Sequence, residues 1–195
     1  MWGWRDIWRH EIFRYEIITY NKYHLHVISH IPTAKSDIRV LLHNIRSAHN
    51  VGSMLRTGDA IDVSHVYLSG YTPHPTDKFG RVVKEIAKTA LGAEKTISWE
   101  CIKNPSALIK KLKGEGFKIV AIEQDVRAVD YKTYGVFPSV HSAKTLVLVG
   151  NEVRGLSKSL RDKCDACVYI PMKGKKESLN VSVAFGIAMF RMFDV

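Results

Sequence analysis

Short runs of consecutive apolar residues recur along the chain from residue 38 onward, and polar or glycine-containing segments separate them. The runs lack the alternation of apolar and polar residues that marks a strand with one solvated face. Continuous runs of this length are typical of strands buried on both faces, as in a parallel sheet covered by helices. The pattern predicts strands at residues 40–42, 66–68, 119–122, 146–149 and 168–170.

Apolar residues at helical spacing fill most of the intervals between these runs. Asn104 and Pro105 form a cap and a first-turn proline, Gly92 and Gly114 stand at stop positions, and Ser157 is a candidate cap. Alternating strands and helices predict an α/β fold with a mostly parallel sheet flanked by helices, in which ligands bind beyond the C-terminal ends of the strands. The predicted helices cover residues 51–61, 82–91, 105–113, 157–163 and 181–192.

The first 37 residues do not share this pattern. Trp2, Trp4 and Trp8 lie close together there, and the spacing of the apolar residues predicts no clean helix. Pro32 and the polar residues after it are typical of a linker. We therefore divide the chain into an N-terminal extension, residues 1–37, and an α/β domain, residues 38–195. The extension is expected to pack on the core, on a partner chain or on RNA, and the first of these is favoured.

Composition narrows the class of protein. The 195 residues are 46% apolar and 25% charged, which is ordinary for a globular domain. The net charge of +10 favours a polyanionic partner, and nucleic acid is the usual one. No apolar run is long enough to cross a membrane, and the N-terminus does not resemble a secretory signal. Three cysteines form no disulfide framework, so we expect a cytoplasmic protein.

Several familiar site motifs are absent. The first predicted strand is not followed by the glycine pattern of dinucleotide-binding folds. Gly174 is followed by two lysines, without the hydroxyl residue that holds magnesium in a phosphate loop. Cys164 and Cys167 lack the second pair of ligands that a zinc site needs. We therefore expect no metal.

Three loops at the C-terminal ends of predicted strands concentrate polar and glycine residues, at 44–57, 149–157 and 170–182. In the first loop, Arg46 and Arg56 offer guanidinium groups that bind phosphate well. In the second, Gly150 allows a ligand to lie against the backbone, and Glu152 places a carboxylate at the strand tip. The third carries a basic cluster and then two residues, Ser178 and Asn180, that can cap the last helix. The basic cluster consists of Lys173, Lys175 and Lys176.

Together the three loops resemble the three motifs of the SpoU (TrmH-type) branch of the SPOUT RNA methyltransferases, over about residues 38–195. The stretches N-x-R…N-x-G-x-x-x-R, V-G-N-E-x-x-G-L-S and I-P-M-x-G…S-L-N-V-S-x-A occur in the family's order and spacing. One departure is Ser47-Ala48, where many members carry Asp-Pro or Asn-Pro. The resemblance implies a SPOUT α/β knot, with a C-terminal trefoil knot, a homodimer, and S-adenosyl-L-methionine as the cofactor.

The resemblance also implies roles for individual residues. The cofactor would be held by Glu123, Gln124, Gly150, Ile170, Met172 and Leu179. The catalytic set would comprise Asn50, Arg56, Glu152, Ser178 and Asn180. The RNA backbone would be bound by Arg46, Lys173, Lys175 and Lys176.

The implied reaction is methylation of a ribose 2′-hydroxyl in tRNA or rRNA. Arg56 is the family's candidate base, but an arginine ordinarily keeps its proton, so we expect it at least to bind the 2′-oxygen or an adjacent phosphate. Two alternatives stay open: an RNA-binding protein of this fold without catalysis, and a methyltransferase that acts on a base nitrogen with Glu152 near the target. For the homodimer, the last helix carries more apolar residues than one narrow face needs, and some should meet a partner chain. These residues are Phe185, Met189, Phe190 and Phe193.

Overall fold

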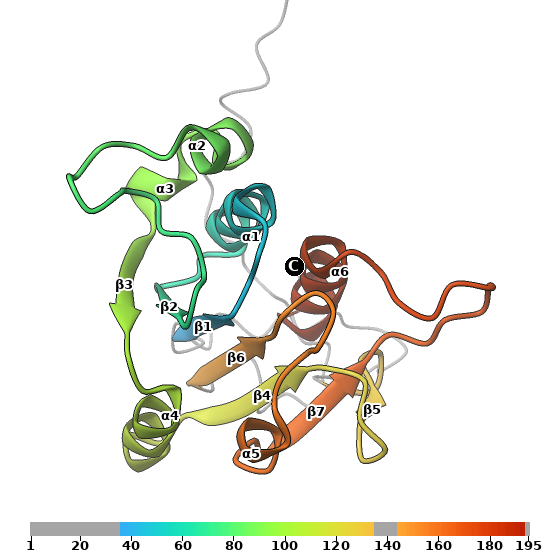
Figure 1. The fold of residues 1–195 in the computed structure, drawn as a ribbon. Helices are drawn as coiled ribbons and strands as arrows, with labels where there is room; N and C mark the ends of the chain where they lie inside the picture. Colours follow the sequence, from blue (N-terminus) through green and yellow to red (C-terminus); the bar gives the residue numbers. More distant parts are fainter. Residues whose placement is uncertain (1–35, 135–143, 194–195) are drawn as a thin grey trace, which may run out of the picture. The chain divides into compact units, whose positions relative to one another are not determined.

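A seven-stranded sheet organises the computed structural model, which describes residues 36–134 and 144–193 (Figure 1). The strand order is β3-β2-β1-β6-β4-β7-β5, and each of these neighbouring pairs is parallel. The predicted mostly parallel sheet is therefore confirmed. The trefoil knot that the resemblance implies stays a prediction. The strands are β1 (Ile38–His43), β2 (His65–Ser69), β3 (Ser98–Ile102), β4 (Lys118–Ile122), β5 (Val129–Asp130), β6 (Thr145–Val149) and β7 (Ala166–Tyr169).

Helices cover both faces of the sheet, and this explains the continuous apolar runs. In β1, Val40 and Leu42 pack in the cluster beneath α1, α2 and α6, whereas Leu41 packs on the opposite side against α4 and α5. Successive side chains of a strand point to opposite faces, so both sets must be apolar when both faces are buried. The helices are α1 (Ala48–Ala60), α2 (Lys84–Ala90), α3 (Ala93–Thr96), α4 (Pro105–Gly114), α5 (Lys158–Arg161) and α6 (Val181–Phe193).

The predicted start and end of α4 are confirmed. The Asn104 side chain accepts a hydrogen bond from the Ala107 N–H at 3.0 Å, Pro105 stands in the first turn, and the helix ends at Gly114. The α5 prediction was too long, because the helix covers only Lys158–Arg161. Ser157 occupies the cap position, but its hydroxyl lies 3.0 Å from the Ser159 hydroxyl and does not cap the helix.

The start of α2 differs from the prediction. Val82 and Val83 were expected inside the helix, but Val82 forms an antiparallel bridge with Thr76 and the helix begins at Lys84. At the other end, Leu91 and not Gly92 ends α2 in the left-handed region, with a φ of 50°. Gly92, with a φ of 103°, occupies the cap position before α3. Residues 82–91 therefore hold a hairpin-like entry and a shorter helix.

The last helix narrows the set of residues available for a partner contact. Of its aromatic and methionine residues, Phe185, Met189 and Phe193 lie in the core beneath the sheet, and only Phe190 is exposed. Three of the four residues from which a partner contact was expected therefore pack in this chain's own core, and Phe190 alone of the four is available for such a contact. The apolar residues on the outer side of α6 are Val183, Ile187 and Phe190.

Two further findings concern membrane-spanning helices and disulfide bonds. Within residues 36–134 and 144–193, no helix is long and apolar enough to cross a membrane. The three cysteines are free, as predicted. The N-terminal extension, apart from its last two residues, lies outside the described residues.

Candidate functional site

A pocket of about 310 Å³ opens where β4, β6 and β7 end. Its walls come from the loops that follow these strands and from the start of α6. The second and third motif loops line this pocket, and the first, which does not, is hydrogen-bonded to Glu152 of the second, so the three meet at one edge of the sheet, as the sequence predicts. Glu152 and Ser178 from the expected catalytic set line the pocket. All six residues expected to hold the cofactor line it as well: Glu123, Gln124, Gly150, Ile170, Met172 and Leu179.

Glu152 joins the first motif loop to the second. Its carboxylate accepts hydrogen bonds from the Arg46 N–H at 2.9 Å, the Ser47 N–H at 3.1 Å and the Asn50 side-chain amide at 3.0 Å. Partial burial raises the pKa of Glu152, but the hydrogen bonds from Arg46, Asn50 and Ser47 outweigh it and hold this pKa below its usual value. Glu152 is therefore ionised, and both of its carboxylate oxygens accept hydrogen bonds from the β1–α1 loop. Because these bonds already use the carboxylate, it is a poor proton acceptor for a base nitrogen.

Asn180 extends the same polar network to the third motif loop. Its side-chain amide donates to the Asn50 Oδ1 at 3.2 Å, so Asn180, Asn50 and Glu152 form one chain of contacts. The Asn180 Oδ1 accepts from the Ser182 N–H at 2.9 Å and caps α6, as predicted. Ser178 was also expected to cap, but it is exposed and makes no hydrogen bond within the described residues.

Glu123 and Gln124 brace the pocket from the end of β4. The Glu123 carboxylate accepts from the Leu156 N–H at 2.7 Å and from the Gln124 N–H at 3.0 Å. The Gln124 side chain reaches across to the Glu177 carbonyl at 2.6 Å. Gly155 has a φ of 62°, and a Cβ there would stand 2.2 Å from the Glu123 Oε2. The second motif loop can therefore close on Glu123 only because residue 155 lacks a side chain.

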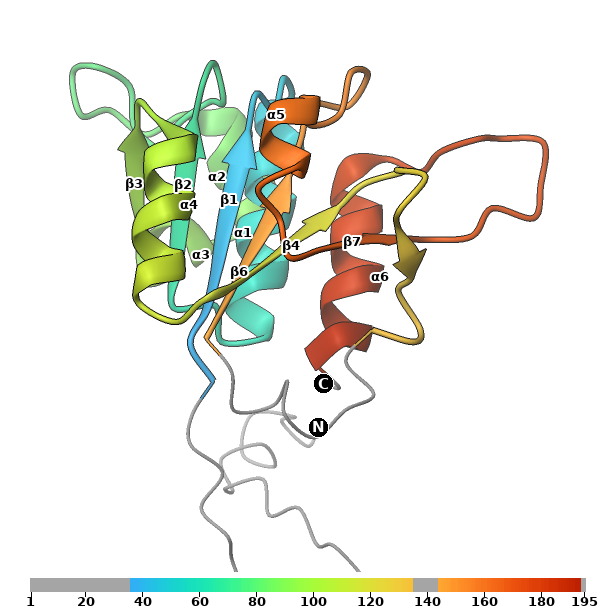
Figure 2. The same ribbon diagram turned by 90° about the horizontal axis from the view of Figure 1, so that it is seen from below.

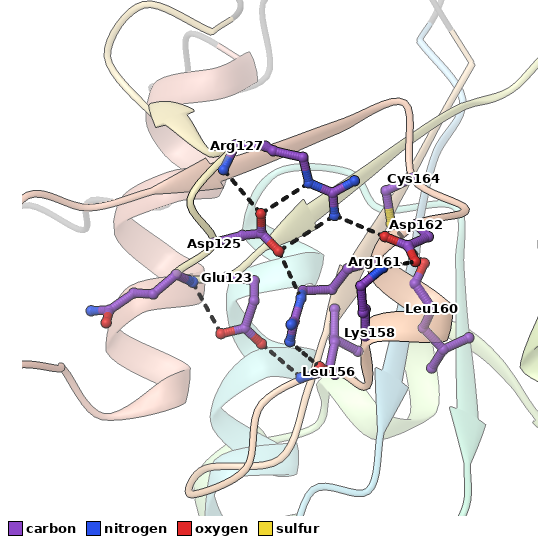
Figure 3. Close-up of polar contacts among 10 residues, drawn as sticks. Glu123, Asp125, Arg127, Leu156, Lys158, Leu160, Arg161, Asp162 and Cys164 are labelled. Atoms are coloured by element: carbon purple, nitrogen blue, oxygen red, sulfur yellow. Dashed lines mark hydrogen bonds and ion pairs between the residues drawn. The ribbon is translucent and has the colours of Figure 1, made fainter.

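An ion-pair network extends this bracing to α5 (Figure 3). Asp125 pairs with Arg127 at 3.1 Å and with Arg161 at 2.8 Å, and the Arg161 guanidinium also donates to the Leu156 carbonyl. The Arg127 side chain is the main cause that lowers the pKa of Asp125 to about 2. Arg161 and Glu123 thus hold the carbonyl and the N–H of Leu156 from two sides.

The structure does not bring every predicted site residue together. Arg56 is exposed on α1, does not line the pocket, and makes no hydrogen bond or ion pair within the described residues. It lies six positions after Asn50, or about 9 Å along a helix axis. The four residues expected to bind RNA are exposed beside the pocket and do not line it: Arg46, Lys173, Lys175 and Lys176.

Two contributors were missed from the sequence. Asn151 is 7% exposed, and its amide donates to the Asn44 carbonyl at 3.0 Å and to the Tyr71 hydroxyl at 2.9 Å. Its position between Gly150 and Glu152 was a usable signal, because an asparagine in a strand-to-helix loop commonly bonds backbone groups. Tyr71 had no sequence signal, since its contact joins residues 80 positions apart. No cluster of metal-ligating side chains occurs among residues 36–134 and 144–193.

Comparisons with known proteins agree on one family. Residues 37–190 match the SpoU rRNA Methylase family. The tRNA (guanosine(18)-2'-O)-methyltransferase of Aquifex aeolicus is 30% identical over 156 residues, which are 80% of this chain and 68% of that enzyme. Staphylococcal relatives of the TrmH family are 30–31% identical, and the match spans 57% of their length.

Solved structures show the same fold. The A. aeolicus TrmH/SpoU tRNA modifying enzyme superposes with a TM-score of 0.69 at 28% identity, over 83% of this chain and 76% of that one. The AdoMet-bound rRNA methyltransferase from Sinorhizobium meliloti superposes with a TM-score of 0.71 at 28% identity, over 83% of this chain and 57% of that one.

Proposed function

The chain belongs to the SpoU rRNA methylase family, and from this premise we propose that it transfers a methyl group from S-adenosyl-L-methionine to a ribose 2′-hydroxyl of tRNA or rRNA. The observation that carries the proposal is the pocket, which the second and third motif loops line. Hydrogen bonds from Asn180 to Asn50 and from Asn50 to Glu152 join these two loops to the first. The net charge of +10 suits an RNA substrate.

The pocket fits S-adenosyl-L-methionine in size and in lining. Its volume of about 310 Å³ lies within the usual range of small-ligand sites. Ile170, Met172 and Leu179 offer apolar contacts for an adenine ring, and Gly150 forms part of the pocket wall beside them. When bound, the cofactor supplies an electrophilic methyl group on a sulfonium.

The chain's own residues would position the ribose. Ser178 is exposed at the pocket with its hydroxyl free of protein partners in the described residues, so it can hydrogen-bond a sugar oxygen. Asn180 is oriented by Asn50 and by its cap on α6. Correct positioning can contribute about 7–11 kcal/mol to a rate enhancement of this kind. We assign Arg56 to the 2′-oxygen or to an adjacent phosphate.

We also propose that the protein is a homodimer through α6. Val183, Ile187 and Phe190 follow a spacing of i, i+4 and i+7 on the outer side of this helix and are 39–48% exposed. A partner docked on this stripe would lie beside α1, because Gly186 of α6 faces Thr57, the neighbour of Arg56. Sedimentation of the full chain should give a dimer, and a monomer would contradict the proposal.

Labelled methyl transfer tests the function directly. RNA that has received labelled methyl groups is digested to nucleosides, and we expect the label in 2′-O-methyl nucleosides. Label in a methylated base would support base-directed transfer instead, and RNA binding without transfer would support a non-catalytic protein. Arg56→Ala should abolish transfer while cofactor binding, measured by calorimetry, survives. Retained turnover would refute the role of Arg56.

A further inference from the structure

A hydrogen-bonded turn in the β2–α2 loop exposes a phenylalanine side chain to solvent. We name residues 76–82 the Phe79 turn. Thr76 and Val82 form an antiparallel bridge at its base, and the Asp77 carboxylate accepts from the Phe79 N–H at 2.8 Å and from the Arg81 N–H at 3.0 Å. Phe79, at the tip, is nevertheless 68% exposed. The turn therefore fixes the backbone while leaving most of a large apolar ring exposed.

Two cations lie over this ring. The Lys78 ammonium is 5.0 Å from the ring centroid, and the Arg81 guanidinium is 4.9 Å from it. Arg81 also pairs with Asp77 at 2.7 Å, which fixes its position, whereas Lys78 has no ion pair within the described residues. An exposed aromatic ring flanked by cations is typical of surfaces that bind unpaired nucleic acid, because bases stack on the ring and phosphates meet the cations.

The loop that carries the turn also reaches the pocket. Tyr71, near its start, accepts a hydrogen bond from Asn151, a pocket-lining residue, and its N–H donates to the Asn44 side chain at 3.3 Å. Tyr71 is itself 58% exposed. Figure 2 shows the loops that follow β1, β2 and β6 along the same edge of the sheet. A strand of RNA at the pocket could therefore extend along this edge to the turn.

We propose that the Phe79 turn is a second RNA contact, in which one unpaired base stacks on Phe79 and the adjoining phosphates lie against Lys78 and Arg81. The inference rests on the proposed function for its choice of RNA. A protein partner would be favoured by a broad apolar patch, whereas here cations flank one ring and favour a polyanion.

The test compares two RNA probes on the full chain. One is a 12-nucleotide single-stranded RNA of mixed sequence with 2-aminopurine at its centre, and the other replaces that nucleotide with an abasic ribose. Stacking on an aromatic side chain contributes about 1–3 kcal/mol per base, so Phe79→Leu should weaken binding of the first probe by about fivefold or more. The same substitution should leave the affinity for the abasic probe unchanged. The fluorescence of 2-aminopurine is quenched when the base stacks on an aromatic ring, so the same titration also reports stacking. Phe79→Trp should restore both the affinity and this quenching.

Lysine variants give a matched test of the phosphate contact. Lys78→Gln should reduce the slope of log affinity against log salt by about one. Lys110→Gln removes the same charge from an exposed position on α4, which packs on the opposite face from α1 and α2, and should leave the slope unchanged.

Three results would overturn the proposal. The first is equal affinity of the wild type and Phe79→Leu for the 2-aminopurine probe. The second is an equal loss of affinity for both probes when Phe79 is changed to Leu. The third is a change of oligomeric state in Phe79→Leu. The last would assign the turn to a second copy of the chain. Failure of the proposed function has a different signature: the wild type would bind S-adenosyl-L-methionine yet transfer no methyl group to any RNA, while the stacking result would stand.

Discussion

The two sides of the pocket are built differently. On one side, the β1–α1 and β6–α5 loops are joined by Glu152, whose carboxylate bonds three groups of the other loop, and by Asn151. On the other side, residues 173–180 of the β7–α6 loop are all exposed. Apart from the cap and amide contacts of Asn180, that stretch is tied to the rest of the described structure by one side-chain contact, from Gln124 to the Glu177 carbonyl.

The difference assigns separate tasks to the two sides. A wall whose hydrogen bonds are already satisfied needs little reorganisation when a cofactor binds, and preorganisation of this kind favours affinity. A loop that keeps its lysines and Ser178 free can instead adapt to RNA and to a partner chain. We therefore expect substitutions on the first side to affect folding and cofactor binding, and substitutions of the three lysines on the second side to affect RNA binding alone.

The largest effect is expected for Gly150→Ala. The new Cβ would stand 2.6 Å from the backbone of Gly155 and Leu156, and backbone atoms cannot move aside as a flexible side chain can. Overpacking of this kind costs about 2–3 kcal/mol, and the pocket wall would be displaced, so cofactor binding by calorimetry should fall below detection. Gly174→Ala is the matched control, since a Cβ there would meet nothing within 4 Å. If both variants behave alike, the comparison is wrong.

A smaller effect is expected for Glu152→Gln. The amide group would present N–H donors to the N–H groups of Arg46 and Ser47, which would leave some of them without an acceptor. The free energy of unfolding should fall by about 1–2 kcal/mol in urea titrations. Glu177→Gln removes a carboxylate from the exposed loop, where the contact to Gln124 uses only the backbone, and should leave stability unchanged.

The dependence of stability on pH tests the contribution of the Glu152 charge. The pKa of Glu152 is lower in the folded protein than its ordinary value, so its contribution to stability is present above about pH 4.3 and is lost as the pH falls through the folded-state pKa. The stability difference between the wild type and Glu152→Gln should therefore be full at pH 7 and should shrink below about pH 4. A difference that stays constant down to pH 3 would contradict the role of the charge.

The smallest effect on folding is expected when Lys173, Lys175 and Lys176 are all changed to Gln. These side chains are exposed and make no ion pairs within the described residues, so the melting temperature and the cofactor affinity should not change. RNA affinity should fall, and its dependence on log salt should lose about three units of slope. A loss of cofactor affinity would show that this loop belongs to the fixed wall.

The sequence predicts the strands of the sheet interior better than its edges. β1, β4 and β6 have buried residues on both faces and appear as apolar runs. β3 was missed because it is an edge strand whose residues are mostly exposed, including Glu100 and Cys101. β5, at the opposite edge, has only two residues. An edge strand needs no apolar run, so periodicity carries no signal for it.

At the site, the sequence predicts which loops meet but not which atoms bond. Glu152 was expected to be available for chemistry, and the structure instead uses its carboxylate to hold backbone N–H groups more than 100 residues away along the chain. The bracing of Leu156 by Arg161 and Glu123 was likewise invisible, because it depends on how α5 folds back on the end of β4. Contacts of this kind follow from the three-dimensional packing of the sheet, which a linear pattern does not encode.

The most direct test of ribose methylation by this protein maps 2′-O-methylated nucleotides in the RNA of cells with and without the gene. We predict that at least one methylated ribose in tRNA or rRNA disappears with the gene. The wild-type gene should restore it, and Arg56→Ala should not. Identical ribose maps, or the loss of a methylated base in place of a methylated ribose, would contradict it.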